Sequence, residues 1–289
     1  MAAVIEARGV SRRFRSRAGE VRALDGVTFS VHQGRIVGLI GPNGAGKTTA
    51  LRAILGLAPY EGELEVLGFD PYTQRNELMK QVCFIADVAV LPGWLRVHQA
   101  VEFVAGVHPH FRPERARELL ERTDIKRDSR VRELSKGMIT QLHLALVMAI
   151  DAKLLVLDEP TLGLDIIYRK QFYESLLGDY FDEERTILIT THQVEEVEHI
   201  LTDLLFIDHG RVVLDTTMEE VAEKFVQLTV NPERLAEARE LKPFYEREVF
   251  GRTVMYFQSA AREALHRLGE ARTPSVADLF VAKIKGVAA

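Results

Sequence analysis

The sequence predicts an α/β protein with a mainly parallel sheet, a helical insertion at about residues 90–150 and a small α+β appendix. Two observations predict this fold. Apolar runs of strand-like alternation take turns along the chain with segments of helical periodicity, the order typical of parallel sheets. Residues 41–48, GPNGAGKT, match the pattern of a loop that holds phosphate between a strand and the helix that follows it.

Alternation and turn residues place the strands of the main part, and a 3.6-residue period places its helices. We predict strands at residues 4–10, 21–31, 35–40, 62–68, 81–86, 153–158, 185–190, 204–208 and 212–215. We predict helices at residues 48–56, 97–107, 113–122, 138–150, 166–180 and 194–201. A charged turn at 12–20 would separate the first two strands.

The order of elements restarts after Thr217. The pattern there predicts a strand at 226–230, a helix at 232–241, strands at 244–250 and 253–258, a helix at 260–268 and a last helix from Ser275. We therefore expect two domains: residues 1–218 with the phosphate loop and the insertion, and an accessory domain of residues 219–289.

Composition narrows the function. The net charge of −5 lacks the basic field of a nucleic-acid-binding protein, so no nucleic-acid partner is expected. The single cysteine excludes an internal disulfide framework and fits a reducing compartment. No stretch approaches the roughly 20 apolar residues of a membrane span, and the first residues carry charge where a secretory signal would be apolar. We expect a chain that is soluble on its own.

Each residue type in the loop has a physical role. Gly41, Gly44 and Gly46 allow the backbone to turn its N–H groups toward phosphate oxygens. Lys47 would reach the β- and γ-phosphates, and the Thr48 hydroxyl would bind Mg²⁺. The candidate ATP-binding residues of this segment are Gly41, Pro42, Asn43, Gly44, Ala45, Gly46, Lys47, Thr48 and Thr49.

An acidic pair ends the predicted strand at 153–158, in the run LLVLDEP. Asp158 would lie beside the phosphate loop and hold Mg²⁺ through water. Glu159 is the candidate general base for the water that attacks the γ-phosphate. The alternative, an acidic strand end that caps the next helix, is weaker because the phosphate loop is present.

With these motifs the chain resembles the ATP-binding cassette (ABC) of ABC transporters over about residues 4–217. The resemblance implies a P-loop NTPase (RecA-like) core with an antiparallel β subdomain, a helical insertion, and ATP hydrolysis with Mg²⁺. It implies that His192 reaches the γ-phosphate and acts with Glu159 and Lys47 in catalysis. Phe14 would stack on adenine, and Asp165 would contact an opposing subunit.

Two motifs depart from the family pattern. The family signature LSGGQ reads LSKGM here, and it retains Ser135 and Gly137, which would meet the ATP held by a partner cassette. The family's Q-loop glutamine is replaced by Asp87, which could still hold a Mg²⁺-bound water. The alternative is that Asp87 only caps a turn.

The resemblance also implies partners. Two cassettes, as a homodimer or a heterodimer, would close around ATP and drive a separate transmembrane permease from the inner face of the membrane. The permease would dock near residues 87–95, where Pro92, Trp94 and Leu95 would form an apolar patch; the alternative places Trp94 in the core. Residues 273–282 are similar to a segment of exporter cassettes, so we expect an exporter.

Three other functions fit the sequence less well. A soluble ABC ATPase of translation or DNA repair usually has two cassettes or a very long coiled coil, and neither is present. A P-loop GTPase would carry an NKxD motif, which the chain lacks. A weakly hydrolysing regulatory cassette in a heterodimer stays open because of Asp87 and the altered signature. The transported substrate is not encoded in this chain.

Overall fold

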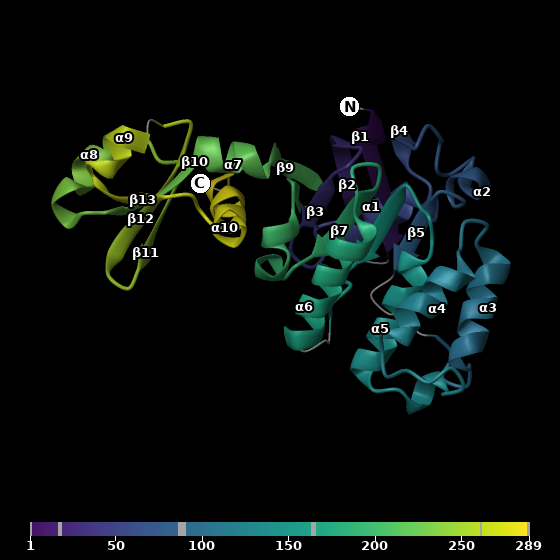
Figure 1. The fold of residues 1–289 in the computed structure, drawn as a ribbon. Helices are drawn as coiled ribbons and strands as arrows, with labels where there is room; N and C mark the ends of the chain where they lie inside the picture. The colour runs from purple at the N-terminus through teal and green to yellow at the C-terminus, as the bar shows by residue number, and fades with distance from the viewer. Residues whose placement is uncertain (1, 17–18, 86–90, 163–165, 261, 288–289) are drawn as a thin grey trace.

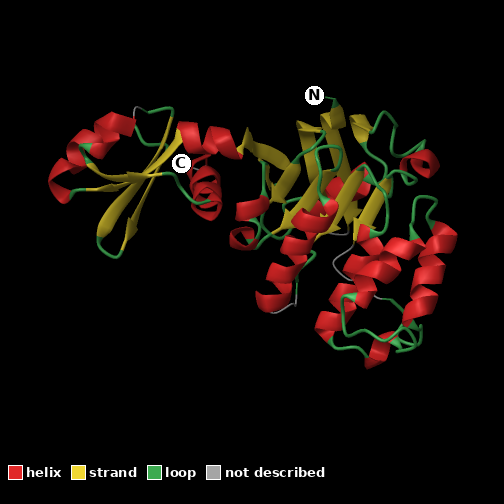
Figure 2. Ribbon diagram, in the orientation of Figure 1, coloured by secondary structure: helices red, strands yellow, loops and turns green. Residues whose placement is uncertain are grey.

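The computed structural model describes residues 2–16, 19–85, 91–162, 166–260 and 262–287 (Figure 1). In these ranges the strands form three sheets: a six-stranded sheet, a three-stranded sheet beside it, and a four-stranded sheet in a separate part of the chain (Figure 2). The predicted α/β class, with an antiparallel subdomain, a helical insertion and an α+β appendix, is confirmed.

The central sheet has the strand order β5-β6-β7-β3-β8-β9. Its strands are β3 (Ile36–Ile40), β5 (Val82–Ile85), β6 (Leu154–Asp158), β7 (Thr186–Thr191), β8 (Asp203–Asp208) and β9 (Arg211–Thr217). The first five strands of this order are parallel, and β9 pairs antiparallel with β8. Side chains of β3 enter a core on each face of the sheet, which is why this strand is an unbroken apolar run.

The antiparallel subdomain has the order β2-β1-β4, formed by β1 (Ala3–Ser16), β2 (Gly19–His32) and β4 (Glu61–Val66). The helix after the phosphate loop, α1 (Lys47–Ile54), contributes to the apolar core that both sheets share. The predicted turn at 12–20 is wrong, because β1 and β2 stay paired up to Ser16 and Gly19. Charged residues such as Arg13, Glu20 and Arg22 fit in this ribbon because their side chains are exposed.

The helical insertion contains α3 (Val97–Val107), α4 (Pro113–Glu121) and α5 (Lys136–Met148), as the periodicity predicts. A short helix α2 (Arg75–Leu78) precedes it, and α6 (Ile166–Ser175) follows β6 and continues into a π-helical turn, Leu176–Tyr180. Helices of the insertion share one core with α6 and one face of the central sheet. The predicted helix at 194–201 is wrong: two 3₁₀ turns, Val194–Glu196 and Glu198–Ile200, form there instead.

The last part of the chain is a βαββαβ unit. Helix α7 (Met218–Lys224), which the sequence reading did not predict, leads into it from β9. The unit runs through β10 (Phe225–Val230), α8 (Leu235–Glu240), β11 (Tyr245–Val249), β12 (Arg252–Gln258), α9 (Arg262–His266) and β13 (Gly269–Arg272). The strand order β11-β12-β10-β13, all antiparallel, is that of a ferredoxin-like split βαβ fold. We propose residues 219–289 as an accessory domain, because this second sheet starts directly after α7.

The last helix, α10 (Val276–Val287), lies between the two parts (Figure 1). Val276 and Leu279 belong to the core of the central sheet, and Ala282 belongs to a small core on the second sheet. None of the helices in the described ranges is long and apolar enough to cross a membrane.

Candidate functional site

Three neighbouring strands bring the predicted catalytic residues to one edge of the central sheet. Because β6, β7 and β3 are parallel and adjacent, their carboxyl ends lie together. The phosphate loop follows β3, the acidic pair ends β6, and His192 follows β7. Crevices at the carboxyl ends of parallel strands are where α/β sheets bind ligands.

The phosphate loop is wound as the glycine pattern predicts. Gly44 and Gly46 have φ angles of 84° and 112°, a region that side chains other than glycine rarely adopt. Gly41 has no such angle, but a Cβ there would lie 2.3 Å from the Ile207 carbonyl oxygen, so only glycine fits. Gly46 caps α1, so the N-terminal end of that helix faces the loop.

Lys47 lies folded into the loop and is 7% exposed. Its Nζ donates to the Gly41 carbonyl oxygen at 2.6 Å and to that of Pro42 at 3.3 Å. Burial lowers the pKa of Lys47, and the charges of Glu159 and Asp158 oppose that shift. The two carbonyl oxygens accept from the ammonium group but carry no full negative charge. A phosphate bound in the loop would give this group an anionic partner.

A cavity of about 380 Å³ opens between the loop and the acidic pair. It is lined by Ala23, Pro42, Asn43, Gly44, Gly46, Lys47, Thr48, Thr49, Asp158, Glu159, Leu162 and His192. Ten of these residues were candidates from the sequence. Ala23 on β2 and Leu162 after the acidic pair were not, because each lies outside the loop and acidic-pair motifs. The loop residues Gly41 and Ala45 are buried and do not line the cavity.

The acidic pair is held by Thr190, which is fully buried on the neighbouring strand β7. The Thr190 hydroxyl donates to Oδ1 of Asp158 at 2.5 Å, and the Thr190 carbonyl accepts the Glu159 N–H at 3.1 Å. Glu159 has φ 48°, in the left-handed region, so its backbone is strained where the chain leaves the strand. Such outliers concentrate at functional sites, and this one aims the carboxylate into the cavity.

Glu159 and His192 contact each other directly. Nδ1 of His192 lies 2.8 Å from Oε1 of Glu159, and the His192 N–H points to Oε2 at 3.4 Å. The Glu159 side chain is 15% exposed and that of His192 is 36% exposed, so both can be reached from the cavity. A carboxylate oriented by an imidazole at the mouth of a phosphate site can accept a proton from water.

The same edge fits Mg²⁺. The Thr48 hydroxyl and the Asp158 carboxylate line one cavity and are hard oxygen ligands. Oδ1 of Asp158 is engaged by Thr190, which leaves Oδ2 for a metal or its water. Mg²⁺ usually takes few protein ligands and completes its shell with water and phosphate oxygens, so two oxygen donors beside a phosphate loop suffice.

Comparisons with known proteins agree with this geometry. The family profile described as ABC transporter matches residues 24–162. A Nod factor export ATP-binding protein I from Rhizobium sp. (strain N33) is 32% identical over 96% of this chain and 95% of its own length. This chain belongs to the ABC transporter family. As one of its cassettes, it is an ATP-binding ATPase.

Further similarities support the same assignment. The daunorubicin resistance ATP-binding protein DrrA3 from Streptomyces coeruleorubidus is 35% identical over 71% of the cassette's chain and 66% of its own. A solved ATP-binding subunit of an ABC transporter superposes with a TM-score of 0.66 at 26% identity, covering 76% of this chain and 92% of that one. A nucleotide-free ATP-binding cassette, 20% identical, shows the same fold with a TM-score of 0.64 over 77% and 94% of the two chains.

The signature residues Ser135 and Gly137 lie outside the nucleotide cavity, at the start of α5. Ser135 caps α5, and its Oγ accepts the Met138 N–H at 3.2 Å. Gly137 lies in the first turn of the same helix. Neither residue lines the nucleotide cavity of its own chain. The first N–H groups of a helix have no partner within it, and here they lie apart from the phosphate loop.

The remaining candidates are Phe14, Asp87, Asp165 and the apolar patch near Trp94. Phe14 lies on β1, 41% exposed, with the Arg12 guanidinium 5.1 Å from its ring centre, and it does not line the cavity. Asp87 and Asp165 fall outside the described residues. The apolar patch was partly wrong: Trp94 is 68% exposed, but Leu95 is buried in the core.

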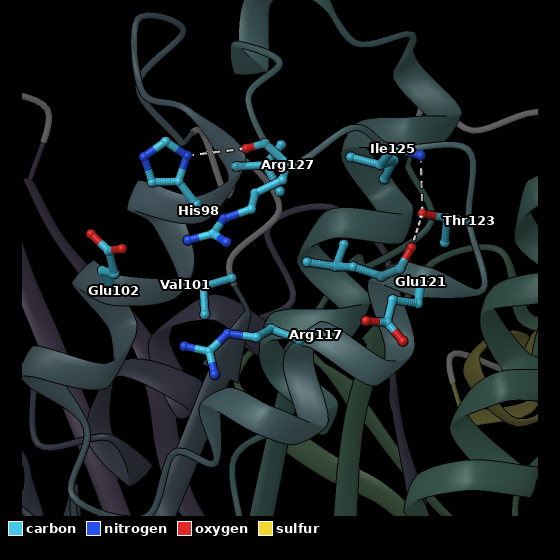
Figure 3. Close-up of a pocket in the computed structure, with 10 residues that line it drawn as sticks. His98, Val101, Glu102, Arg117, Glu121, Thr123, Ile125 and Arg127 are labelled. Carbon is cyan, nitrogen blue, oxygen red and sulfur yellow. Dashed lines mark hydrogen bonds between the residues drawn. The ribbon is translucent and has the colours of Figure 1, made fainter.

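A second cavity, of about 340 Å³, lies within the helical insertion (Figure 3). It is lined by the buried Val101 and Ile125 and by the exposed Arg117 and Arg127, among others. The residues that line it include none of the phosphate-site candidates, so this cavity is separate from the nucleotide cavity.

Proposed function

We propose that this cassette energises an ABC exporter whose permease is a separate chain. The observation that supports the proposal is the single cavity shared by Lys47, Thr48, the acidic pair and His192. In the proposed cycle ATP joins two cassettes, and loss of the γ-phosphate lets them separate. That opening and closing would move the permease.

The roles of the residues follow from their places. The loop N–H groups and Lys47 bind the phosphates and stabilise charge that develops on the γ-phosphate. Glu159 polarises the attacking water, and His192 holds the Glu159 carboxylate and reaches toward the γ-phosphate. Phe14 would stack on adenine from β1.

Mg²⁺ would be held by Thr48 and Asp158, with Asp87 acting through a water. The ion supplies neutralisation of phosphate charge. Thr190 contributes by fixing one oxygen of Asp158, so that the other faces the cavity.

A second cassette completes the site. Ser135 accepts the Met138 N–H with Oγ, so its own hydroxyl proton remains for a phosphate oxygen of the partner's ATP. The Gly137 N–H belongs to the same helix end. Since neither residue lines the cavity of its own chain, we infer that two cassettes face each other head to tail, as a homodimer or a heterodimer.

The direction of transport and the location rest on the relatives. The names of two similar proteins include Nod factor export and daunorubicin resistance, and residues 273–282 read like the exporter segment. We therefore propose export as the direction of transport, with the cassette at the cytoplasmic face of the cell membrane. The exposed Trp94 and Pro92 at the start of the insertion are the proposed contact with the permease.

Glu159→Gln tests the hydrolytic role. The change keeps the size of the side chain and removes the base, so ATP should still bind while phosphate release slows by about 100-fold or more. The variant should accumulate as an ATP-bound dimer in size-exclusion chromatography. Unchanged turnover would refute Glu159 as the base, and a monomer at saturating ATP would refute ATP-driven pairing.

Trp94→Ala tests the permease contact. Because Trp94 is exposed and outside the nucleotide cavity, ATP binding and the melting temperature should stay as in the parent. Recovery of the cassette with membranes that contain its permease should fall. Phe250→Ala, which removes an exposed aromatic from the accessory domain, is the matched control. Equal membrane recovery for Trp94→Ala and the control would exclude Trp94 from the interface.

A further inference from the structure

The signature glycine lies beneath an aromatic ring of its own chain. A Cβ added at Gly137 would lie 2.1 to 2.5 Å from three ring carbons of Tyr168. Carbon atoms that are not bonded do not approach so closely, so the ring occupies the space that a side chain at 137 would fill. Gly137 is buried as a result, whereas Ser135 and Lys136 before it are exposed.

Tyr168 comes from another part of the molecule. It lies in the first turn of α6, which follows the acidic pair of the core, whereas Gly137 lies in the first turn of α5 in the helical insertion. Next to Tyr168 on α6, Ile166 and Ile167 are 81% and 65% exposed. The contact between Tyr168 and Gly137 thus joins the signature turn to a helix start that has exposed apolar side chains.

We propose that Tyr168 is a positioning residue that fixes the first turn of α5 so that Ser135 and its neighbouring N–H groups can receive the ATP of a second cassette. The proposal rests on the proposed function, because the signature acts only across a pair of cassettes. It assigns a role to a side chain outside the nucleotide cavity.

Tyr168 would have this role because it limits the conformational freedom of the first turn of α5. Glycine loses more conformational entropy on ordering than any other residue, so a first turn with glycine at its second position frays readily. A ring packed on its Cα removes that freedom before ATP arrives, and preorganised donors bind an anion more tightly. Lys136, the first residue of this turn, is exposed and adds positive charge near the same donors.

The arrangement also explains why a side chain at 137 would be harmful in this chain. Gly137→Ala would displace the Tyr168 ring, and Tyr168→Ala would free the turn. Both changes break the same contact, so their effects on pairing should not add. If the glycine mattered only for close approach of phosphate, the two effects would multiply.

The test measures ATP-dependent dimer formation in the Glu159→Gln background, together with kcat and KM in the unmodified background. Tyr168→Ala should weaken dimer formation about tenfold and lower kcat, while binding of a fluorescent ATP analogue to the monomer is unchanged. Tyr168→Phe keeps the ring and should behave like its parent. Gly137→Ala combined with Tyr168→Ala should be no weaker than the weaker single variant.

The outcomes separate the two proposals. If Glu159→Gln forms no dimer with ATP, the proposed function fails and this inference falls with it. If that parent pairs and Tyr168→Ala pairs equally well, only the inference is overturned. Loss of pairing in Tyr168→Phe as large as in Tyr168→Ala, or a double variant whose loss is the product of the two single losses, would also overturn the role of the ring.

Discussion

Thr190 orients both acidic residues of the nucleotide site. Its hydroxyl fixes Asp158, and its carbonyl holds the backbone of Glu159 where that residue takes a left-handed conformation. The sequence reading did not single it out, because a threonine in a buried strand is an ordinary β-former. Its position just before Thr191 and His192, at the end of a strand, is the signal that could have found it.

Thr190→Val should separate metal binding from nucleotide binding. Valine has nearly the same shape but no donor, so Asp158 loses the bond that orients it, at a stability cost of about 1–2 kcal/mol. The Mg²⁺ concentration for half-maximal hydrolysis should rise about tenfold or more, while metal-free nucleotide binding changes little. Thr191→Val is the control, because the hydroxyl of Thr191 bonds the Gln193 N–H. A Mg²⁺ curve identical to the parent's would exclude this role.

At the scale of elements, regular periodicity was predictable and irregular geometry was not. The helix at 97–107 agrees to the residue, and Val97, Ala100 and Val101 form its buried face. The segment at 194–201 has the same kind of pattern, yet it folds as two 3₁₀ turns. Strand β13 was missed because its sequence, GEAR, has no apolar alternation; pairing with β10 makes it a strand.

The candidate site shows the same difference between local patterns, which were predictable, and tertiary contacts, which were not. The phosphate loop, the acidic pair and His192 were found because each motif is local and has its own chemistry. Ala23 on β2 and Leu162 line the cavity because of the tertiary fold, and Thr190 acts behind it by bonding Asp158. For Ala23 and Leu162 the sequence contains no comparable local motif.

Ion pairs link the helical insertion to the core. Asp151, which follows α5, bonds Arg112 at the start of α4 and accepts from Arg185 before β7 at 3.0 Å. The Arg185 hydrogen bond, followed by the charge of Arg112, lowers the pKa of Asp151. Since the folded pKa lies below the usual value, this carboxylate contributes stability at neutral pH that is lost as pH falls through the folded pKa.

Asp151→Asn should therefore destabilise the protein at pH 7 and not at acid pH. The side chain is 42% exposed, so the expected loss is only about 0.5–1 kcal/mol in the free energy of unfolding, and salt should reduce it. Urea unfolding from pH 7 to below 4 should show the difference from the parent shrinking. Asp124→Asn, an exposed carboxylate in the same insertion, is the control. A difference independent of pH would assign the effect to packing.

At the scale of the whole molecule, α10 makes the accessory domain more than an appendix. Its Val276 and Leu279 are fully buried in the core of the cassette, and Phe280 packs edge-on against Phe206 of β8, with ring centres 5.1 Å apart. The Val276 N–H donates to Glu198, a few residues beyond His192. The proposed accessory domain thus reaches the segment that follows His192.

Deletion of residues 219–289 should leave ATP binding intact but lower the melting temperature. The cavity residues all lie upstream, so the phosphate site should survive. The deletion also removes α10, however, so the apolar core beside β8 and its Phe206 become exposed to solvent. Leu279→Ala in the full chain should also destabilise the protein, because it leaves a cavity at a fully buried position. The free energy of unfolding should fall by about 2–4 kcal/mol.

Phe250→Ala is the matched control for these two variants, because Phe250 is fully exposed in the hairpin between β11 and β12 and should change stability by less than about 0.5 kcal/mol. Thermal unfolding and nucleotide binding, measured on all three, separate the possibilities. A truncated chain as stable as the parent would show that α10 contributes nothing to the core of the cassette. A truncated chain that cannot bind ATP would show that the two proposed domains fold as one unit, since no side chain of the nucleotide cavity would have been removed.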